Sequence, residues 1–137
     1  MNRRNFIALT AAVSLATPLP ALAEIAKDVD YTPKALRAAL ADGQTVFLDF
    51  KASWCTTCAA QGRVINALRD ENPAYDQGIT FMIADWDQWG QSQIVHDLNV
   101  PRRSTLIVLR GDQELGRIVA GTAQKDIKAL MDLALQA

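Results

Sequence analysis

The chain has 137 residues, of which 50% are hydrophobic and 21% are charged, and it contains no repeat and no low-complexity run. This composition fits one globular domain and leaves no length for a second. With 14 basic and 15 acidic residues the formal net charge is −1, which argues against the strongly basic class of nucleic-acid-binding proteins.

The N-terminal segment, residues 1–23, has the pattern of a secretory signal peptide. An uncharged, alanine-rich stretch follows Arg3 and Arg4 and leads through Pro18 and Pro20 to small residues that end at Ala23. Two prolines interrupt the apolar run, so we expect cleavage after Ala23 rather than retention as a membrane anchor. The arginine pair resembles a twin-arginine export signal, and ordinary Sec export stays open.

The domain that remains, residues 24–137, carries 12 basic and 15 acidic residues and a net charge of −3. We therefore expect no nucleic acid among its partners. Export predicts a periplasmic location, outside the reducing cytosol. A dithiol there must be kept reduced by a dedicated donor or kept oxidised by an oxidant.

The first helix and the first long strand are marked by local signals. Thr32 is a favoured N-cap, Pro33 suits the first helical position, and apolar residues at helical spacing continue to Gly43. Residues 45–50 form a β-rich apolar run that predicts a buried central strand. Asp49 lies inside this run, where a carboxylate is unusual.

The only two cysteines, Cys55 and Cys58, follow that strand at the predicted start of a helix. Thiolates attack disulfides, and a helix N-terminus favours the thiolate, so Cys55 is the expected reactive sulfur. Cys58 lies one turn later, where it can resolve a mixed disulfide. A metal site within one chain is not expected, because zinc needs about four ligands and His96 is the single histidine. A purely structural disulfide would close too short a loop to stabilise the chain much.

The remaining pattern predicts a strand–helix–strand crossover, a hairpin and a final helix. The expected elements are a helix from 56 to the Asn72-Pro73 stop, a strand at 79–84, a short helix at 91–98, strands at 105–109 and 114–119 around a turn, and an amphipathic helix at 122–135. The crossover implies parallel pairing of the first two strands. The order predicts an α/β fold with a mixed sheet between layers of helices.

Three motifs together resemble the thioredoxin superfamily: Leu48-Asp49-Phe50, Trp54-Cys55-x-x-Cys58, and Ser104-Thr105-Leu106 before a strand. The resemblance implies a thioredoxin-like three-layer α/β/α sandwich with a central mixed β-sheet. It also implies a thiol:disulfide oxidoreductase that needs no cofactor. Residues 49–55 are most similar to exported members, including the C-terminal domain of the transmembrane thiol reductant conductor. That similarity favours a monomeric reductase of protein disulfides supplied by a membrane thiol electron donor.

The resemblance also implies roles for individual residues. Cys55 would be the nucleophile, Cys58 the resolving thiol, and Asp49 the buried carboxyl that exchanges a proton with the resolving sulfur through water. Trp54 would form a flat rim for a substrate peptide. Asp49 as a structural carboxylate, and Trp54 as a hydrophobic cover for the helix start, are the alternatives. Uncharged Thr56 and Thr57 between the cysteines weakly oppose a strong oxidant.

One position departs from the family. Members usually carry a cis-proline directly before Thr-Leu, whereas this chain has Ser104 before Thr105. A cis bond without proline costs about 2.5–4 kcal/mol, so a trans Arg103–Ser104 bond and an altered substrate-docking backbone are expected at Ser104 and Thr105. In the family this proline also helps to keep metal ions away from the cysteine pair. Its absence leaves open a dimer bridged by zinc or an iron–sulfur cluster through Cys55 and Cys58 of each chain.

The sequence also gives expectations for residues around the cysteine pair and for the direction of the reaction. Trp86 and Trp89 are expected in the core rather than in a binding groove, and His96 on the surface. Strand alternation places Lys51 on the same sheet face as Asp49. The direction of the reaction stays open, because a disulfide-donating oxidase could use the same cysteines.

Overall fold

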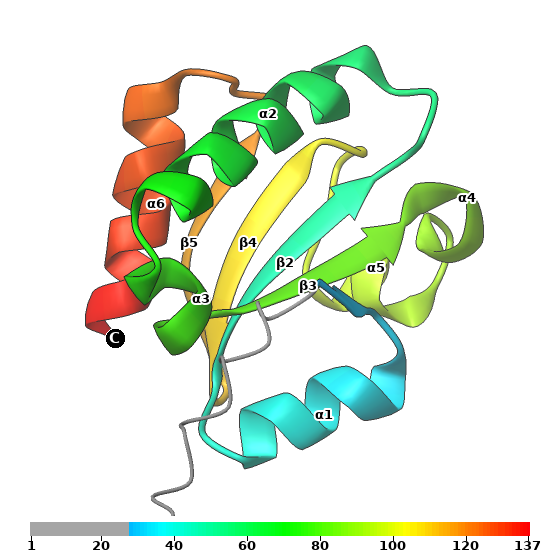
Figure 1. Ribbon diagram of the computed structural model, residues 1–137. Coiled ribbons are helices and arrows are strands. Elements are labelled where there is room, and N and C mark those ends of the chain that lie inside the picture. The colour runs from blue at the N-terminus through cyan, green and yellow to red at the C-terminus, as the bar shows by residue number, and fades with distance from the viewer. Residues whose placement is uncertain (1–27) are drawn as a thin grey trace, which may run out of the picture.

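The computed structural model describes residues 28–137, so the predicted signal peptide lies outside the described residues (Figure 1). The elements are, in chain order, β1 (Val29–Asp30), α1 (Pro33–Ala41), β2 (Thr45–Lys51), α2 (Thr56–Glu71), α3 (Ala74–Gly78), β3 (Thr80–Asp85), α4 (Trp86–Trp89), α5 (Gln93–Asp97), β4 (Thr105–Arg110), β5 (Gln113–Val119) and α6 (Gln124–Gln136). Each predicted helix and strand is present within a few residues of its expected bounds.

The five strands form one mixed sheet in the order β1-β3-β2-β4-β5. β2 pairs with β3 in parallel and with β4 antiparallel, and β4 pairs antiparallel with β5. The predicted parallel crossover and the predicted hairpin are therefore both confirmed. β2, which ends just before the cysteines, lies at the centre of this sheet and is buried along nearly its whole length.

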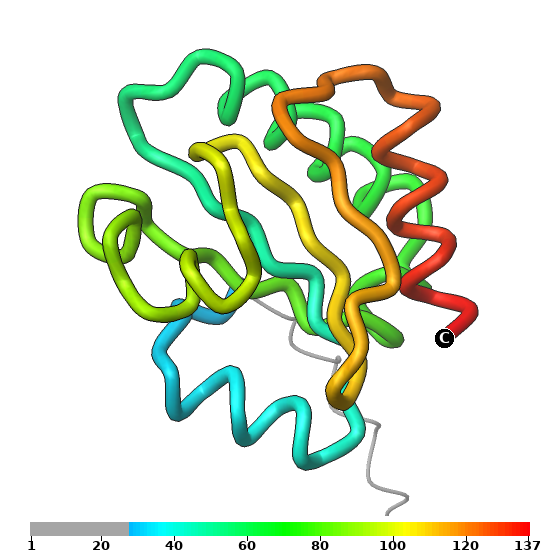
Figure 2. Tube along the Cα trace, turned by 180° about the vertical axis from the view of Figure 1, so that it is seen from behind, coloured from blue at the N-terminus to red at the C-terminus, as the bar shows by residue number. Residues whose placement is uncertain are grey.

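Helices cover both faces of the sheet, as predicted for a three-layer sandwich (Figures 1 and 2). Alternate residues of β2 point to opposite layers. Leu48 and Phe50 pack with Leu36 of α1 in one core cluster. Phe47 packs with Ile65 of α2 in the other cluster, which also contains residues of α3 and α6. Asp49 alternates with Leu48 and Phe50 and so belongs to the α2 side of β2.

Helix α1 begins where the sequence predicted. The Thr32 hydroxyl accepts a hydrogen bond from the Ala35 N–H at 3.0 Å, and Pro33 occupies the first turn. A side-chain cap of this kind contributes about 1 kcal/mol. The helix ends before Gly43, which adopts a φ of +77° that glycine tolerates at no steric cost. This turn returns the chain into β2.

Two short elements after β3 place the tryptophans. α4 begins at Trp86, where the Asp85 carboxylate accepts a bond from the Asp87 N–H at 3.0 Å. Trp86 packs edge-to-face on Phe50 with ring centroids 6.4 Å apart, and Trp89 packs edge-to-face on Tyr31. Both tryptophans are partly buried and pack against the core, close to the predicted position. His96 on α5 is exposed, also as predicted.

No helix in the described part of the chain combines the length and the apolar character needed to cross a membrane.

Candidate active site

The two cysteines lie at the junction between β2 and α2 and form a disulfide with a Cα–Cα distance of 5.2 Å. Cys55 is the N-cap of α2, and its sulfur accepts a hydrogen bond from the Cys58 N–H at 3.1 Å. The sulfur thus takes the place of the hydroxyl or carboxylate oxygen that commonly caps a helix. An N–H bond and the positive end of the helix dipole both favour a negative charge on this atom. Both cysteines are 3% exposed.

Ser104 lies directly against the pair. Its Oγ is 3.2 Å from Cys55 Sγ and 3.0 Å from Cys58 Sγ, and the residue has no exposed surface. The described residues contain no cis peptide bond, so the Arg103–Ser104 bond is trans, as predicted. Ser104 instead adopts a left-handed φ of +64°. A residue other than glycine pays of order 1–3 kcal/mol for such a conformation, so surrounding structure must hold it in place.

Backbone and side-chain bonds fix Ser104 on both sides. Its N–H donates to the Phe50 carbonyl at 2.7 Å, and its carbonyl accepts from the Ala120 N–H at 2.9 Å. Gln61 Nε2 donates to the same Ser104 carbonyl at 3.0 Å and to the Gly121 carbonyl at 2.9 Å. Ser104 is therefore held between the end of β2, helix α2 and the chain that follows β5.

Sequence reasoning missed Gln61, which is fully buried in α2. A signal for it exists, since Gln61 lies between Cys58 and Ile65 at spacings of three and four residues, on the buried face of the helix. A glutamine on that face needs polar partners. Those partners lie 43 and 60 residues away in the sequence, which is why the pattern alone does not identify them.

Asp49 is 5% exposed, and its Oδ1 has no hydrogen-bond partner. Burial raises the pKa of this carboxyl to about 7, an effect that the Lys51 ammonium opposes and the Asp28 carboxylate reinforces. The alternative of an exposed or well hydrogen-bonded structural carboxylate does not fit this position. A group with a pKa near neutrality can both accept and donate a proton under ordinary conditions.

Two neighbouring hollows, one beside the Asp49 carboxyl and one beside the cysteines, share part of their lining. A cavity of about 40 Å³ is lined by Asp49, Lys51, Gly62 and Asn66, among others. A surface depression of about 350 Å³ beside Cys55 and Cys58 is also lined by Lys51, Gly62 and Asn66. The two hollows therefore share a wall on the α2 side of β2. A water molecule in the small cavity would have polar partners in Asp49, Lys51 and Asn66.

Trp54 forms an exposed rim next to Cys55, with 57% of its surface open to solvent. Its indole N–H donates to Asp87 Oδ1 at 2.9 Å, and the guanidinium of Arg103 lies 4.5 Å from the centre of its ring. The ring is thus held from two sides while one face stays open. The sequence did not indicate either contact, because Asp87 of α4 and Arg103 of the loop before β4 are both distant from Trp54 in the chain.

Thr105, predicted to contact substrate together with Ser104, is fully buried at the start of β4. Its hydroxyl donates to the Arg102 carbonyl at 2.7 Å. That Ser104 and Thr105 dock substrate through their backbone stays a prediction, but the Thr105 side chain fixes the loop before the strand and does not meet solvent. Ser104 likewise faces the sulfurs and not the surface.

The space opposite the cysteines, expected to be open without the family's proline, contains the Ser104 side chain. Within residues 28–137, no group of three or more His, Cys, Asp or Glu side chains is arranged to hold a metal ion.

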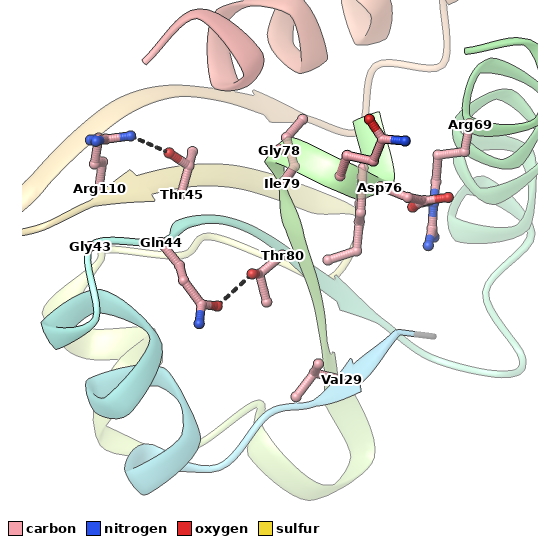
Figure 3. Close-up of a pocket in the computed structure, with 12 residues that line it drawn as sticks. Val29, Gly43, Gln44, Thr45, Arg69, Asp76, Gly78, Ile79, Thr80 and Arg110 are labelled. Carbon is pink, nitrogen blue, oxygen red and sulfur yellow. Dashed lines mark hydrogen bonds and ion pairs between the residues drawn. The ribbon is translucent and has the colours of Figure 1, made fainter. Parts of the chain in front are cut away.

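A further pocket of about 410 Å³ lies at the opposite end of the sheet, where β2 and β3 begin (Figure 3). Thr80 Oγ1 donates to Gln44 Oε1 at 2.6 Å, and Arg110 donates to Thr45 Oγ1 at 3.0 Å in its wall. These polar side chains in the pocket lining are therefore hydrogen-bonded to one another. The pocket borders neither cysteine.

Comparison with known proteins identifies the family. The thioredoxin family model matches residues 27–133. The chain belongs to the thioredoxin family. The similar solved structures include Trxlp from Edwardsiella tarda EIB202, at 28% identity and a TM-score of 0.65, covering 75% of this chain and 98% of that one. A comparison with curated proteins finds no match.

Two solved thioredoxin structures share the fold at lower identity. The thioredoxin of Trypanosoma brucei brucei is 22% identical with a TM-score of 0.67, over 87% of this chain and 100% of that one. The thioredoxin of Malassezia sympodialis is 23% identical with a TM-score of 0.65, over 80% of this chain and 95% of that one. Family membership and the Cys55–Cys58 disulfide together make this chain a thiol:disulfide oxidoreductase. The finer similarity to the transmembrane conductor's C-terminal domain stays a prediction.

Proposed function

We propose that this thioredoxin is an exported reductase that passes two electrons from its dithiol to protein disulfides. The observation that carries the proposal is a helix-capping Cys55 sulfur together with a buried Asp49 carboxyl, whose cavity shares lining residues with the depression beside the cysteines. The first group is placed to attack a disulfide, and the second to manage the proton of the resolving step.

In the first step the Cys55 thiolate attacks one sulfur of the substrate disulfide. A bond forms between Cys55 Sγ and that sulfur, the substrate S–S bond breaks, and the other substrate sulfur leaves as a thiolate that takes a proton from solvent. The Cys58 N–H and the start of α2 stabilise the attacking charge before the bond forms.

In the second step Cys58 resolves the mixed disulfide. Its thiol proton passes to the Asp49 carboxylate through water, and the new thiolate attacks Cys55 Sγ. The Cys55–Cys58 bond forms and the second substrate sulfur leaves and is protonated. The enzyme dithiol is oxidised to the disulfide, and the substrate disulfide is reduced to two thiols. Because the pKa of Asp49 is about 7, a large fraction of this carboxyl is ionised and ready at neutral pH.

The rim around the cysteines supports protein disulfides as substrates. Trp54 offers an exposed aromatic face, and the nearby cations Lys51, Arg63 and Arg103 favour acidic segments. We propose that a membrane thiol donor returns the disulfide to the dithiol and that the enzyme works as a monomer.

Export is supported by the sequence of residues 1–23 and by the family match, which begins at residue 27. We propose cleavage after Ala23 and a periplasmic location. N-terminal sequencing of protein recovered from the periplasm should begin at Glu24, and recovery of the full chain in the cytoplasm would contradict export. Replacing both Arg3 and Arg4 by lysine should block export by the twin-arginine route and leave Sec export unchanged.

The assignment of the cysteines is tested with the mature domain in an insulin reduction assay. Cys55→Ser should abolish reduction, because no thiolate remains at the helix start. Cys58→Ser should still attack but should accumulate mixed disulfides that a non-reducing gel can resolve. A Cys55→Ser variant that reduced insulin at the wild-type rate would overturn the assignment. A purified wild-type protein that is dimeric and holds zinc or a coloured cluster would favour the metal-bridged alternative instead.

A further inference from the structure

We propose that the Ser104 hydroxyl is a hydrogen-bond donor to the reduced cysteine pair, so that Ser104 acts on the reacting sulfur atoms themselves. The inference rests on the proposed function only in that the same dithiol carries the electrons. It gives a chemical role to the residue that stands where the family usually has proline.

The contact is short and enclosed. Ser104 Oγ lies 3.2 Å from Cys55 Sγ and 3.0 Å from Cys58 Sγ, inside the range of hydrogen bonds to sulfur. The residue has no exposed surface, and among the described residues these two sulfurs are the partners of the hydroxyl. A buried hydroxyl keeps a hydrogen-bond partner wherever one is in reach, so its proton points to the sulfur pair.

The surroundings allow the hydroxyl little freedom. The left-handed φ of +64° is held by bonds from Ser104 to Phe50 and Ala120, and by the buried amide of Gln61. Four segments of the chain, at β2, α2, β4 and the end of β5, meet at this one residue. A strained conformation that is held from several sides is typical of functional positions, and here it aims a donor at the reacting atoms.

The hydrogen bond should strengthen when the pair is reduced. A disulfide sulfur is a weak acceptor and carries no charge, whereas a thiolate is a full anion and forms a charge-assisted bond. Reduction adds two electrons and one proton to the disulfide and gives the Cys55 thiolate with the Cys58 thiol. Cys55 Sγ would then accept two bonds, from the Cys58 N–H and from Ser104 Oγ. Ser104 therefore stabilises the dithiol state relative to the disulfide.

Charged groups near the cysteine pair act on it through their electric fields and not through hydrogen bonds to the sulfurs. Lys51 and Arg63 line the depression beside the cysteines, Asp49 lines the adjoining cavity, and Arg103 stacks on Trp54. None of these side chains is hydrogen-bonded to either sulfur within residues 28–137. Their fields are present in every Ser104 variant, so a comparison of such variants isolates the hydroxyl.

The test uses two substitutions in the mature domain, Ser104→Ala and Ser104→Gly. Both remove the hydroxyl. Alanine leaves the cost of the left-handed backbone in place, and glycine removes it. The readouts are the pH profile of Cys55 alkylation by iodoacetamide and the equilibrium constant with glutathione. Ser53→Ala is the matched control, because Ser53 is an exposed serine beside the same cysteines.

Both Ser104 variants should need a higher pH for half-maximal alkylation. In both, the thiolate fraction below that pH should fall roughly ten-fold, the effect expected for losing a hydrogen bond to a charged group. The glutathione equilibrium should shift toward the protein disulfide by a similar factor, and Ser53→Ala should match the wild type. Unchanged profiles in both Ser104 variants would overturn the proposal. A shift in one variant only would assign the effect to the backbone and overturn it as well.

These readouts need no protein substrate and no assumption about direction. An enzyme that fails to reduce insulin but shows the Ser104 shift would contradict the proposed reductase and leave this inference standing. An active reductase whose alkylation profile is the same in the wild type and in both Ser104 variants would contradict this inference and leave the proposed reductase standing.

Discussion

Lys51 and Asp49 lie two residues apart on β2 and line the same cavity of about 40 Å³. The Lys51 ammonium lowers the pKa of Asp49, against the larger effect of burial, which raises it to about 7. Strand alternation predicted that both side chains share one face of the sheet, and the shared cavity confirms it. The lysine thus limits how far burial raises the pKa of the Asp49 carboxyl.

Replacing Lys51 by methionine should raise the pKa of Asp49 above about 7, since the opposing charge is lost while the burial stays. At neutral pH less of the carboxylate would be free to accept the Cys58 proton, so resolution should slow and recover at higher pH. Titration of the carboxyl by NMR measures the pKa directly. Lys34→Met, on the exposed surface of α1, is the control and should leave it unchanged. A Lys51→Met protein with the wild-type pKa would contradict this coupling.

Asp49 should destabilise the fold at neutral and alkaline pH. Between the ordinary pKa near 4 and the folded value of about 7, the unfolded chain loses a proton that the folded chain keeps, so stability falls as pH rises through this window. The penalty is complete above about pH 7 and absent below about pH 4, and it is on the order of 4 kcal/mol. Asp49→Asn should therefore raise the free energy of unfolding in urea at pH 8 and change it little at pH 4. An equal gain at both pH values would show that ionisation is not the cause.

Gln61 should be important for stability because its buried amide N–H groups bond two carbonyls from distant parts of the chain, one buried and one partly buried. Its Nε2 donates to Ser104 and Gly121, and Gln61→Met would remove both bonds while keeping a similar volume. We expect a loss of about 1–3 kcal/mol in the free energy of unfolding. Gln93→Met on the exposed surface of α5 should change it by less than about 0.5 kcal/mol. Equal stabilities for the Gln61 and Gln93 variants would argue against the structural role of the buried amide.

Asp87 should affect protein substrates more than small ones. It accepts the Trp54 indole N–H at 2.9 Å, so Asp87→Ala would release one side of the exposed rim. With insulin we expect kcat/KM to fall roughly three-fold, as for one ordinary hydrogen bond. With a small aromatic disulfide the rate should stay unchanged, because the sulfurs are not altered. Asp112→Ala in the exposed β4–β5 turn is the control. A proportional fall with both substrates would point to damage at the sulfurs rather than at the rim.

Local signals in the sequence predicted most of the fold. Thr32 and Pro33 set the start of α1, and the continuous apolar run at 45–50 predicted the buried strand that contains Asp49. The strand β1 was missed because two residues carry no periodicity. α3 and α4 are single turns that follow Pro73 and Asp85, too short for a helical pattern.

The site was predictable to the extent that its chemistry is local. The placement of Cys55, Cys58, Asp49 and Trp54 follows from one stretch of twelve residues, 47–58. Ser104 was recognised as a departure, but its left-handed backbone was not, because serine has no special preference for that conformation. The partners that hold the site, Gln61 and Asp87, act across 43 and 33 residues, a separation at which sequence pattern gives no signal.

The most direct measurement is the reduction potential of the Cys55–Cys58 pair in the metal-free mature domain. The reference values are about −270 mV for thioredoxin and about −120 mV for a strong periplasmic oxidant. A reductase with uncharged Thr56 and Thr57 between its cysteines should lie near the lower value, even with the opposing contribution of Ser104. A potential near the higher value would contradict the proposed direction, because the protein would then donate its disulfide to its partners.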